Sequence, residues 1–111
     1  MVERFIEKYP QVDSTTAEIL DTIIMDLHPA IERQWKWGTL CYAINHKVFA
    51  YYGLKGKAIK LGLWNKNVIS STIIHRDLKL MGYYIVENLN DELVADLSIS
   101  LEECMAYRLK A

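Results

Sequence analysis

The side chains best suited to bind a ligand are aromatic residues and a lysine within the predicted strands of residues 39–64. Strict alternation places Phe49, Tyr51, Lys60 and Trp64 on one face of a sheet, with glycines at positions 53 and 62 beside them. Aromatic rings next to a cation can stack a flat anionic ligand or anchor a partner protein, and glycines allow close approach.

We therefore expect Tyr51, Lys60 and Trp64, with Trp37 near the sheet edge, to form a ligand or partner surface. The ligand is then an unidentified small anionic molecule or a protein. In the alternative arrangement, residues 65–76 and the last helix cover this face, and the rings belong to the core.

Carboxylate pairs are the candidate ligands for a hard cation such as ferrous iron. Glu18 and Asp21 are spaced i, i+3 on a predicted helix, and Glu92 and Asp96 are spaced i, i+4 on another. A solvated acidic helix face has the same pattern, so we assign no metal site and no cofactor.

Catalytic and metal-binding motifs are absent from the sequence. Cys41 and Cys104 belong to no C-x-x-C unit, and the histidines at positions 28, 46 and 75 share no ligand spacing. No set of acid, base and nucleophile can be assembled, so we do not expect an enzyme.

Charge is distributed unevenly along the chain. Residues 33–79 carry nine Lys or Arg side chains and one acid, whereas both flanking segments are acidic and the formal net charge is -1. This balance gives no strongly basic footprint for duplex nucleic acid. It places positive charge on the predicted strands and negative charge on the predicted helices.

Helical spacing predicts a short first helix ending before Pro10 and a second helix opened by a Thr15–Glu18 capping box. Pro29 at a first helical position predicts a short helix that runs to Gly38. After the strands, a helix is expected to begin near Asn90, and a Ser100–Glu103 capping box predicts a separate final helix.

Alternation of period two predicts three strands, separated by turns at residues 45–47 and 55–57, and a further strand over Tyr83–Val86. The helix-covered face is expected to carry eight apolar side chains, those of Leu40, Tyr42, Ile44, Val48, Tyr52, Ile59, Leu61 and Leu63. We assign no secondary structure to residues 65–82, the segment before the last strand, because residues 65–76 fit both a helix and a strand.

The fold class is therefore α+β: N-terminal helices, an antiparallel meander of about four strands, and C-terminal helices packed on one face of the sheet. With 111 residues, 51% hydrophobic and 24% charged, residues 1–111 are expected to form one domain. No apolar run is long enough to span a bilayer, and Met1 to Pro10 is too charged for a signal peptide, so we expect a cytoplasmic protein and no membrane partner.

The segments FIEKYP, HPAIERQWKWG and YAINHKVFAYYGLKGKAIKLGLW, which lie between Phe5 and Trp64, resemble the YdhG-like family of bacterial domains of unknown function. That family includes a frataxin-like iron chaperone. The resemblance implies a small cytoplasmic α+β domain with a helix layer on one side of an antiparallel sheet and no established enzymatic reaction. It also adds some weight to iron binding by Glu18 and Asp21, and it leaves the oligomeric state open.

Overall fold

The computed structural model describes residues 1–110 as an antiparallel sheet with helices on one face. The helices are α1 (Val2–Lys8), α2 (Ser14–Met25) and α3 (Asp91–Lys110). The strands are β1 (Glu32–Lys36), β2 (Thr39–Ile44), β3 (Lys47–Lys55), β4 (Ala58–Trp64), β5 (His75–Arg76) and β6 (Met81–Val86). The expected α+β class is confirmed.

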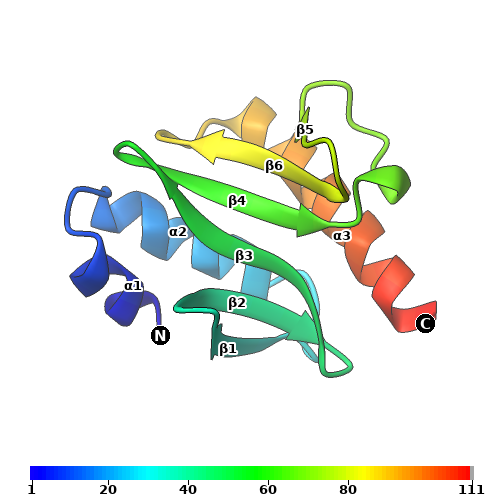
Figure 1. Ribbon diagram of the computed structural model, residues 1–111, viewed down its shortest axis with the longest axis horizontal. Helices are drawn as coiled ribbons and strands as arrows, with labels where there is room; N and C mark the ends of the chain where they lie inside the picture. The colour runs from blue at the N-terminus through cyan, green and yellow to red at the C-terminus, as the bar shows by residue number, and fades with distance from the viewer. Residues whose placement is uncertain (111) are drawn as a thin grey trace.

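The sheet has six strands in the order β1-β2-β3-β4-β6-β5, and every neighbouring pair is antiparallel. Strands β1 to β4 follow one another as a meander, as Figure 1 shows. The two strands beyond the expected four are β1 and the two-residue β5, which form opposite edges of the sheet.

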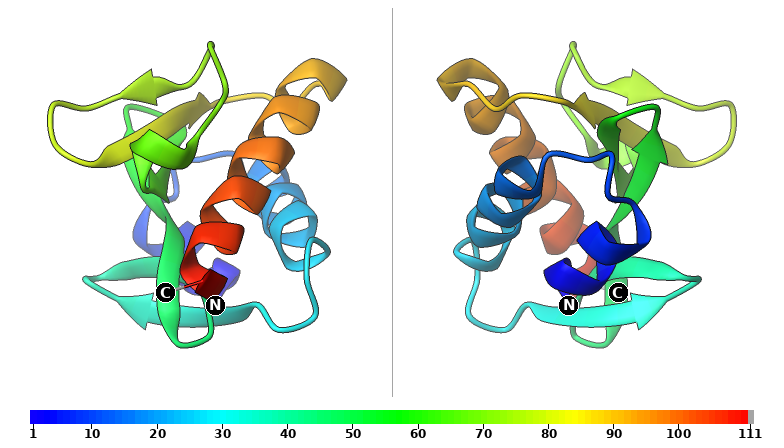
Figure 2. Two further views of the ribbon diagram at one scale, coloured as in Figure 1. Left: turned by 90° about the vertical axis from the view of Figure 1, so that its right-hand side faces the viewer. Right: turned by 90° about the vertical axis from the view of Figure 1, so that its left-hand side faces the viewer.

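Helices α2 and α3 lie on the same side of the sheet (Figure 2), and α1 packs beside them through Phe5, whose ring centroid is 5.1 Å from that of Tyr52. Between the layers, Leu20, Leu61 and Leu97 are fully buried. The opposite face of the sheet carries no helix. We call it the open face.

The segment expected as a short helix up to Gly38 is instead strand β1. That prediction was wrong because a residue with positive φ can end a helix or turn a hairpin, and glycine suits both. Trp37 and Gly38 both have positive φ, 55° and 73°, which is the conformation of a two-residue hairpin turn. Pairing with β2, which the local pattern does not reveal, then fixes β1 as a strand.

Both predicted capping boxes were wrong. Helix α2 is capped by Asp13, which accepts a hydrogen bond from the backbone N–H of Thr15 at 3.0 Å. Helix α3 is a single helix from Asp91, and Asn90 caps its start by accepting from the N–H of Leu93 at 2.8 Å. Ser100 is buried in the middle of α3, where its hydroxyl lies 2.7 Å from that of Tyr84.

Residues 65–82 contain a short 3-10 turn, η1 (Lys66–Val68), then β5 and the first residues of β6. Ile69 and Ile74 join the core cluster. The backbone N–H of Ser70 donates to Glu103 on α3 at 3.1 Å, and the Ser71 hydroxyl donates to Asp96 at 2.6 Å. Residues 69–74 thus pack against the helix layer and do not cover the open face.

Candidate functional site

A bulge in β3 decides which side chains reach the open face. Ala43 pairs with Val48 and Tyr42 with Ala50, so Phe49 is an extra residue without a partner on β2. Paired residues share a face, which places Val48 beside Ala43 on the open face. Phe49 is fully buried in the core cluster. The sequence-based placement of Phe49 outside and Val48 inside was therefore wrong, because the bulge shifts the alternation by one residue.

Tyr51 lies across strand β4 at a position that only glycine permits. A Cβ atom added at Gly62, its cross-strand partner, would lie 2.2 Å from the Cε1 atom of the Tyr51 ring. The absence of a side chain at residue 62 therefore lets the ring lie over β4. Burial raises the pKa of the Tyr51 phenol, which keeps it neutral near pH 7.

Trp64, at the end of β4, pairs with a cation from the far end of the chain. The guanidinium carbon of Arg108 lies 4.7 Å from the centroid of the Trp64 ring, and Arg108 Nε donates to the backbone oxygen of Val48 at 2.9 Å. Within residues 1–110 the terminal nitrogens of Arg108 have no hydrogen-bond partner. The indole Nε1 of Trp64 is buried and has none either.

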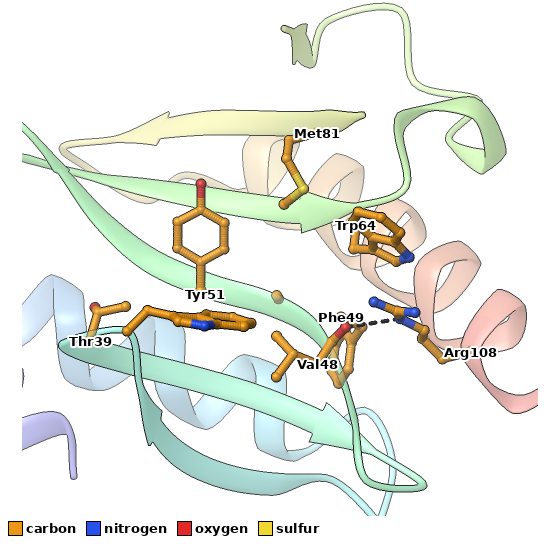
Figure 3. Close-up of a pocket in the computed structure, with 9 residues that line it drawn as sticks. Thr39, Val48, Phe49, Tyr51, Trp64, Met81 and Arg108 are labelled. Carbon is orange, nitrogen blue, oxygen red and sulfur yellow. Dashed lines mark hydrogen bonds between the residues drawn. The ribbon is translucent and has the colours of Figure 1, made fainter. Parts of the chain in front are cut away.

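These side chains enclose a pocket of about 470 Å³ on the open face (Figure 3). Its lining consists of Trp37, Thr39, Val48, Phe49, Ala50, Tyr51, Trp64, Met81 and Arg108. In Figure 3 the indole nitrogen of Trp64 and the guanidinium of Arg108 lie side by side. The lining contains no carboxylate, so its charge is positive.

Three of the four expected surface residues thus come together: Tyr51, Trp64 and Trp37, of which Trp37 is 75% exposed. Lys60 does not line the pocket. Its Nζ lies 4.5 Å from the ring centroid of Tyr83, farther along the same face.

Arg108 is the pocket residue that sequence analysis missed. Forty-three residues separate it from Trp64 along the chain, and it lies in an acidic C-terminal segment away from the predicted basic strands. No local pattern reveals that the last turn of α3 reaches Val48. Burial lowers the pKa of Arg108, although the guanidinium stays charged at physiological pH.

One carboxylate of each pair considered for iron binding, Asp21 and Asp96, already accepts hydrogen bonds from other side chains. Both oxygens of Asp21 accept hydrogen bonds from Arg33, at 2.9 and 2.7 Å, and Oδ1 also accepts from the Tyr42 hydroxyl. Asp21 is 5% exposed, so it forms neither an open carboxylate pair with Glu18 nor part of a solvated acidic helix face, and both alternatives were wrong for this residue. In the second pair, Asp96 accepts hydrogen bonds from Ser71 and Tyr84. In the described part of the chain no three His, Cys, Asp or Glu side chains gather to hold a metal.

Both cysteines are free and buried. Burial raises the pKa of the Cys41 thiol and raises that of Cys104 to about 12, so both favour the unreactive thiol form. Cys41 Sγ donates to the backbone oxygen of Lys36 at 3.6 Å. Neither thiol therefore resembles an activated nucleophile.

None of the helices over residues 1–110 is long and apolar enough to cross a membrane. Comparisons of the chain with models of known families, with curated proteins and with solved structures found no match. The pocket is therefore interpreted from its own geometry.

Proposed function

We propose that this protein is a non-catalytic binding domain that takes a small, flat, anionic molecule in the pocket between Tyr51, Trp64 and Arg108. The observation that carries the proposal is an aromatic lining beside donors that have no hydrogen-bond partner within residues 1–110, namely the Trp64 indole N–H and the terminal nitrogens of Arg108. A pocket of about 470 Å³ is in the size range of small-molecule sites.

Flatness and negative charge both follow from the lining. The rings of Trp37, Tyr51 and Trp64 offer faces on which another planar group can stack. Arg108 uses Nε on the backbone and keeps its terminal nitrogens for an acceptor, and these nitrogens match the two oxygens of a carboxylate or phosphate. A cationic ligand would meet this guanidinium and be repelled.

The proposal includes membership of the YdhG-like family and a cytoplasmic location, which rest on the sequence resemblance. The iron-chaperone alternative has no specific support, because Asp21 is bound to Arg33 and Tyr42. Binding of a protein partner in place of a small anion is one outcome that the experiment distinguishes.

The test is a titration of the ¹⁵N-labelled protein with planar aromatic carboxylates and mononucleotides, each paired with a neutral analogue. We expect changes in amide chemical shifts that are confined to residues around the pocket. The anions should cause these changes, and the neutral analogues should not. Arg108→Gln should weaken this binding about tenfold or more, since it removes a charge-assisted hydrogen bond.

A matched control is Arg4→Gln. The guanidinium carbon of Arg4 lies 4.2 Å from the ring centroid of Trp35, so this substitution removes the same kind of cation–ring pair on the helix-covered side. Equal weakening by both substitutions, or shifts scattered over the surface, would overturn the proposed site. Binding of a protein partner alone, with no small anion bound, would overturn the ligand class.

A further inference from the structure

A second group of rings and cations lies on the open face outside the pocket. The rings of His75 and Tyr83 are stacked, with centroids 5.1 Å apart and planes inclined by 15°. Lys60 Nζ lies 4.5 Å from the centroid of the same Tyr83 ring. His75 is exposed, whereas Lys60 and Tyr83 are half-buried. The pocket does not use any of these three side chains.

This second group is continuous with the pocket through the sheet register. Tyr51 pairs with Gly62, Gly62 with Tyr83, and Tyr83 with His75, so the four residues form one row across strands β3, β4, β6 and β5. Neighbouring strands are about 4.8 Å apart, which puts Tyr51 and Tyr83 roughly 10 Å apart along the row. The Tyr51 ring lies over the glycine between them, so the ring itself extends toward Tyr83 and no other side chain separates the two rings along the row.

Cations flank this row. Arg108 stands at the pocket end and Lys60 beside Tyr83. Asp77 is the acid nearest to Lys60 along the sequence. Its carboxylate accepts hydrogen bonds from the backbone N–H groups of Lys79 and Met81 at 2.8 and 3.0 Å, and attraction to Lys66 and Lys60 helps to lower its pKa, so it stays ionised and offsets part of the positive charge at Lys60. A ligand that fits the row therefore carries a flat ring for each of the two ring positions and negative charge near Arg108 and Lys60.

We infer that the open face binds single-stranded nucleic acid, with one base in the pocket, a second base on the Tyr83–His75 stack, and the phosphates between them near Arg108 and Lys60. This inference rests on the proposed function and extends it from one flat anion to a strand of them. Single strands offer unpaired bases for stacking on rings and a phosphate for each base. In a duplex the bases are stacked on one another and cannot reach the row.

The experiment measures the binding of fluorescein-labelled octamers of uridine and of thymidine by anisotropy, with the corresponding mononucleotides as competitors. We expect each octamer to bind at least tenfold more tightly than its mononucleotide, because it reaches both ring positions. Lys60→Gln should weaken octamer binding and leave mononucleotide binding unchanged. It should also reduce the slope of log affinity against log salt by about 0.7, the value for one phosphate contact on a single strand.

Lys57→Gln is the matched control, since it removes the same charge from the exposed β3–β4 turn, outside the row. It should leave both affinities unchanged. Octamers that bind no more tightly than mononucleotides would overturn this inference while leaving the pocket proposal intact. The inference would also be overturned, and the pocket proposal kept, if aromatic carboxylates bound but no nucleotide did, or if a duplex bound as tightly as an octamer. Failure of every small anion and every octamer to bind would overturn both proposals.

Discussion

At the scale of single residues, Gly62 controls the shape of the pocket. We expect Gly62→Ala to force the Tyr51 ring off β4, since the new Cβ would lie 2.2 Å from that ring, and to cost about 1–3 kcal/mol of unfolding free energy. Ligand binding should fall together with stability. Chemical denaturation and the titration described above measure the two effects.

Gly53→Ala is the control for this substitution, because its added Cβ would meet its nearest neighbour at 3.4 Å, an ordinary contact distance. A second check is the double variant Tyr51→Ala with Gly62→Ala. Removing the ring removes the clash, so the two losses should not be additive. Additive losses would show that the ring is not what Gly62 accommodates.

Asp21 is a second residue whose environment the structure defines closely. It is buried, it pairs with Arg33, and it accepts the Tyr42 hydroxyl. We expect Asp21→Asn to lower the free energy of unfolding by about 2 kcal/mol, because an amide cannot accept all three hydrogen bonds. The cost stays below that of a fully buried pair, since the Arg33 side chain is 39% exposed.

Urea denaturation measures this change, with Asp26→Asn as the control at an exposed carboxylate at the end of α2. The control should change stability by less than about 0.5 kcal/mol. Equal effects of the two substitutions would contradict a structural role for the Asp21–Arg33 pair.

At the scale of elements, the segment between β4 and β6 is held to α3 by few side chains. The hydroxyl of Ser71 donates to Asp96 and accepts from the N–H groups of Ile73 and Ile74. We expect Ser71→Ala to increase hydrogen exchange over residues 69–76, since these donors lose their acceptor, and to leave β2 and β3 protected.

Ser70→Ala is the neighbouring control, because Ser70 is exposed and contacts Glu103 through its backbone N–H. Exchange that rises throughout the sheet in the Ser71 variant would show global destabilisation. Unchanged exchange over residues 69–76 would show that Arg76, which donates to the backbone oxygens of Ile69 and Ser71, holds the segment by itself.

Strand β1 and the bulge in β3 show where local patterns fail at this scale. The hairpins of β2, β3 and β4 were predicted because alternation and turn residues are local signals. Residues 48–50 are all apolar, so alternation cannot locate the extra residue Phe49. For β1, the residues Trp37 and Gly38 form a hairpin turn whose glycine also fits a helix end.

At the scale of the whole molecule, burial of ionisable groups predicts sensitivity to alkali. Burial raises the pKa of Tyr84 and of Cys104 to about 12, and raises that of Tyr42 well above its ordinary value. The ordinary values are 9.0 for cysteine and 10.0 for tyrosine. Between those values and the raised ones, the unfolded chain has lost protons that the folded protein still holds.

Stability is therefore expected to be fully present below about pH 9 and to fall as the pH rises toward 12, by up to about 1.4 kcal/mol per pH unit for each such group. Urea denaturation at pH 7, 9, 10 and 10.5 measures the fall. Cys104→Ala should make it shallower between pH 9 and 10.5, because one of the groups is gone. A free energy of unfolding that is constant from pH 7 to pH 10.5 would contradict the buried, protonated state of these side chains.

The sequence by itself determined the α+β class and placed Tyr51 and Trp64 on one face, because strand alternation and turn formation depend on residues close together in the chain. Only the tertiary structure decided that Phe49 is buried, that Asp21 is bound to Arg33, and that Arg108 completes the pocket. These features join distant segments, and packing between the sheet and the helices selects them after each element has formed. Local periodicity in the sequence therefore cannot predict that packing.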